Sequence, residues 1–207
     1  AIVGPSGSGK STLLNVLLRT NNTYQGQVKI DGIELKDIKQ SSIYELFSVI
    51  HQNVFIFNGS LKENITLFKE YSDIQLNNVI KLAGLSELVT SKGMDYICGE
   101  NGANLSGGER QRISIARCLL HATDVLLVDE ATASLDCITA ADILNSVLDL
   151  QDMTKIVVTH YLEESTLKRF DFTISISNGK VCEIGPFDEL MEQKKLLYSM
   201  MMSGKES

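Results

Sequence analysis

Several residue types are scarce in this 207-residue sequence, and each absence excludes a class of protein. With no tryptophan and only two prolines, the sequence holds no proline-rich linker. The four cysteines form no CxxC pair, which excludes a zinc ribbon and a thioredoxin motif. Basic residues are outnumbered, with 19 Lys and Arg against 26 Asp and Glu. This balance argues against nucleic acid as the partner, because phosphate contacts need clustered Lys and Arg.

Long apolar runs are missing too. The most apolar stretch, residues 113–128, is interrupted by Arg117, His121 and Asp124, so we expect no membrane-spanning helix within these residues. The composition, 43% apolar and 22% charged, is typical of a globular domain. The widely spaced cysteines fit reduced thiols in a cytosolic compartment.

Short β-branched runs alternate with amphipathic segments, the pattern of a mostly parallel sheet covered by helices. Buried strands are expected at residues 47–50, 125–128 and 156–159. Hairpins are expected at the Asp31-Gly32 and Asn178-Gly179 turns. Apolar residues at helical spacing follow residue 60, and the segment from 186 to 202 is also helical in pattern. We therefore expect an α/β fold with an antiparallel β part on the N-terminal side and a helical insertion at about residues 60–120.

A glycine-rich loop follows the first apolar residues and precedes an apolar helix. Its sequence, GPSGSGKS from Gly4 to Ser11, matches the P-loop pattern. Such a loop points backbone N–H groups at phosphate oxygens, and the helix N-terminus adds partial positive charge. Lys10 is expected on the β- and γ-phosphates, and the Ser11 hydroxyl on Mg²⁺. The nucleotide-binding candidates here are Gly4, Pro5, Ser6, Gly7, Ser8, Gly9, Lys10, Ser11 and Thr12.

Two adjacent carboxylates end the apolar run at residues 125–128. A P-loop NTPase holds Mg²⁺ with an Asp at the tip of a neighbouring strand, which assigns Asp129 to the metal. Glu130 would then face the γ-phosphate and polarise the attacking water. If both residues continue the strand, their side chains point in opposite directions and can serve different roles.

The sequence LSGGERQR, from Leu105 to Arg112, predicts a helix N-terminus at Ser106, Gly107 and Gly108, and thus a second anion-binding site. It closely resembles the signature motif of ABC-type ATPases, and the resemblance covers essentially the whole chain. By this resemblance, the 207 residues form one ABC-type ATPase domain that works as a Mg²⁺-dependent ATP hydrolase.

The resemblance implies roles for further residues. Gln52 is similar to the Q-loop glutamine, which senses Mg²⁺ and the nucleotide water, and His160 to the switch histidine that contacts the γ-phosphate. Ser134-Leu135-Asp136 is similar to the D-loop, and Asp136 joins the nucleotide-binding set. The resemblance thus implies Glu130, His160 and Gln52 as catalytic residues and Ser11, Gln52 and Asp129 around the metal.

The family also implies a head-to-tail pair of such domains, with ATP between the P-loop of one and the signature of the other. The second domain can be identical or different, since no catalytic position is degenerate here.

Two functional classes remain open: the motor of a membrane transporter, and a soluble ABC ATPase acting on DNA or ribosomes. No coiled-coil heptads separate Gln52 from Leu105, and the chain holds one cassette only, which favours the transporter. Residues 54–65 and Glu100 resemble the corresponding segments of exporter-type cassettes. We therefore expect an exporter domain, truncated at its N-terminus, with a transmembrane domain upstream. It would lie at the cytoplasmic face of the cell membrane.

Two aromatic residues follow the Q-loop glutamine. Phe55 and Phe57 lie in an apolar run beside the expected helical insertion. We hypothesise that they belong to a groove that holds a short cytoplasmic helix of the transmembrane domain.

Overall fold

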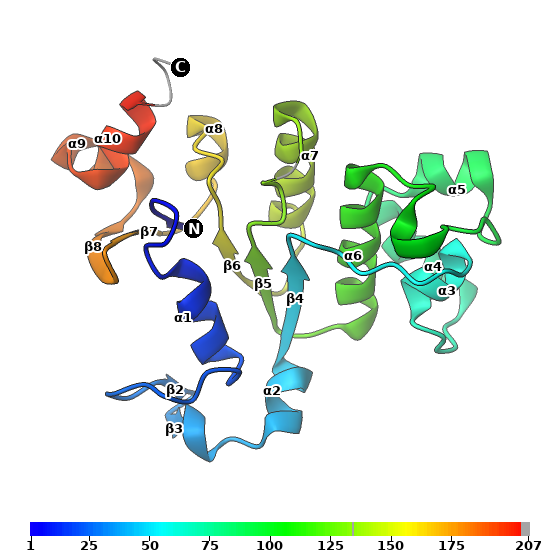
Figure 1. Cartoon of the computed structure of the whole chain (residues 1–207), viewed down its shortest axis with the longest axis horizontal. Helices are drawn as coiled ribbons and strands as arrows, with labels where there is room; N and C mark the ends of the chain where they lie inside the picture. Colours follow the sequence, from blue (N-terminus) through cyan, green and yellow to red (C-terminus); the bar gives the residue numbers. More distant parts are fainter. Residues whose placement is uncertain (134, 204–207) are drawn as a thin grey trace.

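The centre of the fold is a six-stranded sheet in the order β4-β5-β6-β1-β7-β8 (Figure 1). The computed structural model describes residues 1–133 and 135–203. β1 pairs in parallel with β6 and β7, and only β8 runs antiparallel to its neighbour. The predicted mostly parallel sheet is therefore confirmed. Its strands are β1 (Ile2–Val3), β4 (Phe47–His51), β5 (Val125–Asp129), β6 (Thr154–Val158), β7 (Thr173–Ser177) and β8 (Lys180–Gly185).

The two predicted hairpins are present. β2 (Lys29–Ile30) and β3 (Ile33–Glu34) form a separate antiparallel pair, and both turn residues, Asp31 and Gly32, have positive φ angles. Asn178 and Gly179 do the same between β7 and β8. Consecutive positive φ angles match the right-handed twist of the flanking strands, which is why Asp-Gly and Asn-Gly signal hairpins.

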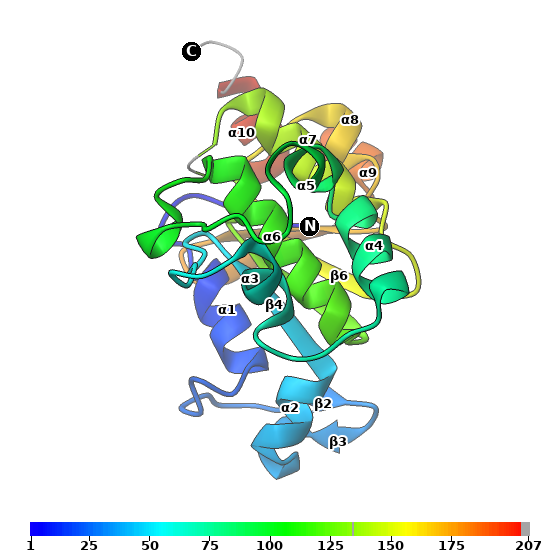
Figure 2. The same ribbon diagram turned by 90° about the vertical axis from the view of Figure 1, so that its right-hand side faces the viewer.

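Ten α-helices surround the sheet in the described part of the chain. Figures 1 and 2 show α3, α4 and α5 gathered beside α6, on the far side of it from β4. The only strand-like pairing among α3 to α6 is an isolated bridge between Ser60 and Ile97, so the expected helical character of this region is confirmed. The helices are α1 (Lys10–Leu17), α2 (Gln40–Leu46), α3 (Leu61–Thr66), α4 (Asp73–Leu82), α5 (Ser86–Lys92), α6 (Gly107–His121), α7 (Cys137–Leu148), α8 (Glu164–Leu167), α9 (Phe187–Gln193) and α10 (Leu196–Ser203).

Helices cover both faces of the sheet, as side-chain alternation along β5 demonstrates. Leu126 and Val128 belong to the core that contains the buried residues of α6 and α7. Leu127, between them, belongs to the core that contains Leu14 of α1. Successive side chains of a strand point to opposite faces, so β5 is buried on both sides. This burial explains why its sequence is a continuous apolar run.

The C-terminal segment is helical, as predicted, but forms two helices instead of one. Lys194 has φ 52° and ends α9 in the left-handed conformation. α10 then begins at Leu196 and buries Leu197 and Met201 against α9. Within residues 1–133 and 135–203, no helix is long and apolar enough to cross a membrane.

Candidate functional site

The glycine-rich loop connects β1 to α1 at the edge of the sheet where the parallel strands end (Figure 1). A Cβ at Gly4 would lie 2.1 Å from the Ile176 carbonyl oxygen, so only glycine allows β7 to pack this close. Gly9, the N-cap of α1, has φ 103°, which other residues rarely adopt. The predicted loop and helix N-terminus are thus both formed.

Two buried polar side chains of the loop, Lys10 and Ser8, lie where a phosphate group would bind. The Lys10 Nζ is buried and donates hydrogen bonds to the carbonyls of Gly4 and Pro5, each 3.0 Å away. The Ser8 hydroxyl is buried without a hydrogen-bond partner. Buried polar atoms are normally paired, so an orphaned hydroxyl beside a cation inside the loop fits a phosphate group.

The first turn of α1 meets the end of β5. The Ser11 hydroxyl donates a 3.0 Å hydrogen bond to Asp129 Oδ1 across 118 residues of sequence. Both residues line a pocket of about 350 Å³, together with His51, Gln52, Asn53 and Glu130. Hydroxyl, amide and carboxylate oxygens are the ligands that Mg²⁺ prefers, and it uses few of them when phosphates complete its shell. The donors therefore fit the predicted metal.

Glu130 lies beyond the strand, so the expectation that it continues β5 is wrong. The strand ends at Asp129, and Glu130 has φ 49°, in the left-handed region. Its N–H bonds to the Val158 carbonyl at 3.1 Å. A non-glycine residue in this conformation persists only when its surroundings hold it, and such residues cluster at functional sites. The backbone turn, instead of strand alternation, separates the directions of the two carboxylates.

The Glu130 carboxylate contacts two other predicted site residues. Its Oε1 lies 2.8 Å from His160 Nε2 and 3.7 Å from Lys10 Nζ. His160 follows β6 by two residues, and Lys10 begins α1. Three residues from distant parts of the sequence thus meet at one carboxylate oxygen.

Gln52 comes directly after β4, and its side chain is exposed in the pocket of Ser11 and Asp129. Its backbone carbonyl accepts a 2.9 Å hydrogen bond from Gln111 Nε2 on α6, which also donates to the His51 carbonyl. This bond couples the position of the Gln52 loop to α6.

The predicted helix start is formed at the beginning of α6. The Ser106 hydroxyl accepts a hydrogen bond from the Glu109 N–H, and the Glu109 carboxylate accepts one from the Ser106 N–H. This reciprocal pair is a capping box, which fixes the helix start. Ser106, Gly107 and Gly108 do not line the pocket of Ser11 and Asp129. Within the described part of the chain, the signature and the P-loop therefore stay apart.

Comparison with known proteins places this site in a family. The family model described as "ABC transporter" matches residues 1–133. The chain belongs to the ABC transporter family. Its nucleotide-binding fold also matches the solved structure of a bacterial Atm1-family ABC exporter with ATP bound, with a TM-score of 0.89 and 32% identity. That match covers 98% of this chain and 36% of the exporter.

Curated relatives of this ABC domain are longer proteins. An ATP-dependent lipid A-core flippase of Haemophilus influenzae is 39% identical over 99% of this chain, which spans 36% of the flippase. A β-(1→2)glucan export ATP-binding/permease protein of Bartonella bacilliformis is 34% identical, with 35% of its length matched. The chain spans about a third of the length of the curated relatives it matches.

The D-loop of the ABC domain is described in part, because Ser134 lies outside the described residues. Asp136 is the N-cap of α7, and its carboxylate accepts a 3.0 Å hydrogen bond from the Thr139 N–H. This bond holds the pKa of Asp136 below its usual value. Asp136 is exposed and does not line the pocket of Ser11 and Asp129.

The sequence did not reveal every residue at the site. His51 and Asn53 line the pocket beside Gln52, and Gln111 holds the Gln52 loop from α6. Gln111 is buried although it is polar, and a polar residue on the buried face of a helix is the signal that points to such a role.

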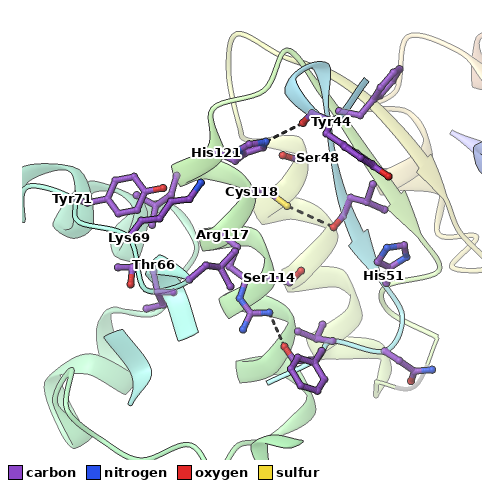
Figure 3. Close-up of a pocket in the computed structure, with 18 residues that line it drawn as sticks. Tyr44, Ser48, His51, Thr66, Lys69, Tyr71, Ser114, Arg117, Cys118 and His121 are labelled. Carbon is purple, nitrogen blue, oxygen red and sulfur yellow. Dashed lines mark hydrogen bonds between the residues drawn. The ribbon is translucent and has the colours of Figure 1, made fainter. Parts of the chain in front are cut away.

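A second, larger cavity lies between β4, α6 and the end of α3 (Figure 3). Its volume is about 480 Å³. Phe55 lines it, as hypothesised, whereas Phe57 does not and packs edge-to-face between Phe55 and Phe68 instead. We call this cavity the β4–α6 groove.

Proposed function

We propose that this chain is the ATP-binding and ATP-hydrolysing domain of an ABC exporter. The observation that carries the proposal is the meeting of Glu130, His160 and Lys10 beside the P-loop. A carboxylate held beside the lysine that binds phosphate lies where it can orient the attacking water and accept its proton. We also propose that residues 1–207 form a single ATPase domain with a helical insertion at about residues 60–120.

Phosphoryl transfer to water needs positioning and charge stabilisation more than covalent chemistry. In the proposed mechanism, the loop from Gly4 to Thr12 binds the phosphates of ATP through its backbone N–H groups (Pro5 has none), the Lys10 ammonium and the Ser8 hydroxyl. Ser11, Asp129 and Gln52 would hold Mg²⁺, which neutralises phosphate charge when bound. Glu130 orients the attacking water and accepts its proton, and His160 holds Glu130 and the γ-phosphate.

The proposed site needs a second ATPase domain. The start of α6 at Ser106 is exposed, and its backbone N–H groups lie outside the P-loop pocket of the same chain. A helix N-terminus attracts anions. These groups would therefore bind the phosphates held by the P-loop of an identical or related partner, and Asp136 would join the same interface.

The curated relatives support a membrane partner, because they include an export permease and a flippase. We propose that a transmembrane domain is fused to this chain, so that the chain lies on the cytoplasmic face of a membrane. The β4–α6 groove would hold a short cytoplasmic helix of that domain.

Replacing Glu130 by Gln in the full-length polypeptide that contains this chain tests the proposal. The variant keeps the size of the side chain but cannot accept the proton, so ATP hydrolysis falls by about 10²–10⁴-fold. ATP binding remains, because the change removes repulsion against the γ-phosphate, and an ATP-bound dimer accumulates in gel filtration.

Lys10→Ala is the contrasting variant. It removes the cation that binds phosphate, so it should lose nucleotide affinity and not accumulate as the ATP-bound dimer. Wild-type hydrolysis by Glu130→Gln would show that another group activates the water.

A further inference from the structure

The two charged side chains that line the β4–α6 groove, Lys69 and Arg117, are both cations. His51, Lys69, Arg117 and His121 line it, and none of its lining residues is Asp or Glu. Figure 3 shows these four side chains arranged around the cavity, from β4, α6 and the segment after α3. The chain as a whole has the opposite balance, with 26 acidic and 19 Lys and Arg residues. The groove is therefore a local cationic surface on an acidic domain.

Arg117 is a partly buried cation without an anionic partner among the described residues. Its guanidinium donates to the Phe55 carbonyl and the Asn64 carbonyl, each at 2.7 Å, and to Asn64 Oδ1 at 3.0 Å. All three acceptors are neutral, and burial lowers the pKa of Arg117. Buried charges are normally paired with an opposite charge. Lys69 is exposed and likewise forms no ion pair with a described carboxylate.

One rim of the groove is apolar and exposed. Phe55 is 61% exposed, and Phe68 is 62% exposed on the other side of Phe57. Leu67 and Phe68 both have positive φ angles, a backbone conformation that costs free energy and is found at ligand clamps. Contiguous exposed apolar side chains mark interaction surfaces. The structure thus holds an apolar rim beside the cationic wall.

We propose that the β4–α6 groove selects a cytoplasmic helix that carries a carboxylate beside an apolar side chain. The carboxylate lies between Arg117 and Lys69, and the apolar side chain packs on Phe55 and Phe68. Charge complementarity of this kind fixes the register of a partner and rejects segments with a basic residue at the same place. The inference rests on the proposed function, because it assumes that the occupant of the groove belongs to a membrane domain.

Carbodiimide cross-linking of the full-length protein in detergent tests the inference. The reagent activates a carboxylate, and the Lys69 amine displaces the resulting urea to form an amide, which requires the two groups to be in contact. Mass spectrometry should find Lys69 joined to an Asp or Glu in a cytoplasmic loop of the membrane domain. Lys69→Arg keeps the charge but removes the reactive amine, so it should lose this product. Lys69 joined to no carboxylate, or only to those of this chain, overturns the inference.

A charge swap is an independent test of the inference. Lys69→Glu should lower ATP hydrolysis by the full-length protein several-fold, and replacing the cross-linked acid by Lys should restore it. Lys81→Glu is the matched control, since Lys81 is exposed on α4 and does not line the groove. A Lys69→Glu effect no larger than that of Lys81→Glu also overturns the inference. ATP hydrolysis by the unmodified protein is measured in the same assay, and its absence would overturn the proposed function instead.

Discussion

Single residues of the same type differ widely in this structure, and the cysteines illustrate how far environment decides chemistry. Cys98 and Cys118 are buried, whereas Cys137 and Cys182 are exposed, and all four are free thiols. Burial raises the pKa of Cys118 to about 12, because the apolar surroundings disfavour the thiolate. Neighbouring Ser48 and Arg117 act in the opposite direction but do not compensate. Cys118 therefore stays protonated in the folded protein at any ordinary pH.

This shift makes stability depend on alkaline pH. The unfolded thiol ionises above its ordinary pKa of 9.0, whereas the folded thiol does not until about 12. Raising the pH above 9 therefore stabilises the unfolded state, by about 1.4 kcal/mol for each pH unit in this range. Urea unfolding at pH 8 and pH 10 should show a smaller loss of stability for Cys118→Ala than for the wild type. Cys182→Ala, at an exposed position, should lose as much as the wild type; equal losses for all three proteins would refute the assignment.

At the site, the sequence predicted residue types better than backbone conformations. Ser11, Gln52, Asp129 and Glu130 line one pocket as expected, because strand ends and a P-loop leave little freedom in where they meet. The left-handed φ of Glu130 could not be predicted, since it depends on a hydrogen bond to Val158 in another strand. The catalytic and metal-binding roles of these residues stay predictions.

At the scale of elements, local signals predicted most of the structure. The helix start at Ser106 and the two hairpin turns depend on a few neighbouring residues each, and all three are formed as expected. The break between α9 and α10 was missed, because the segment carries neither Gly nor Pro between the two helices. A contact from elsewhere holds the second helix: Glu183 of β8, which is buried, accepts a 2.6 Å hydrogen bond from the Leu197 N–H.

This bond predicts that Glu183 anchors α10 to the sheet. Glu183→Ala leaves the Leu197 N–H unpaired, which costs about 1–3 kcal/mol, and α10 should open more often. Hydrogen exchange followed by mass spectrometry should show faster exchange at residues 196–203, with ATP hydrolysis unchanged. Glu192→Ala serves as the control, because Glu192 is exposed on α9. Unchanged exchange in the Glu183 variant would mean that apolar packing alone holds the helix.

At the scale of the whole molecule, the two helix starts that are predicted to bind anions do not share a pocket. Lys10 and Ser11 begin α1 next to Asp129, whereas Ser106 caps α6 beyond the Gln52 loop. In the proposed mechanism, each chain thus carries two different halves of a phosphate site, the P-loop and the signature, at separate places. Two chains related by a two-fold axis can join these halves into two equivalent sites, each using the P-loop of one chain and the signature of the other.

This arrangement predicts complementation between two inactive variants. Lys10→Ala removes the P-loop cation, and Ser106→Asp keeps a good helix cap while placing a negative charge where phosphate would bind. Each variant alone has two defective sites. Co-expressed with different affinity tags, they form mixed dimers in which one site carries both defects and the other carries none. Dimers purified by both tags are all mixed and hold one intact site of two, so they should recover about half of the wild-type rate of ATP hydrolysis. The unfractionated product of random pairing, in which about half of the dimers are mixed, should recover about a quarter.

The control for the cap substitution is Ser72→Asp, because Ser72 caps α4 with the same kind of capping box. It should hydrolyse ATP at the wild-type rate, which separates the effect of charge at the phosphate site from any effect on helix capping. If Ser72→Asp is active and the mixed dimers are not, one intact site does not suffice or the signature does not act on the partner's nucleotide. A tandem protein that carries both substitutions in one half distinguishes these cases: each of its sites holds one defect when the signature acts across the interface, and it is then inactive. If each chain used its own signature, its unmodified half would retain a complete site and hydrolyse ATP.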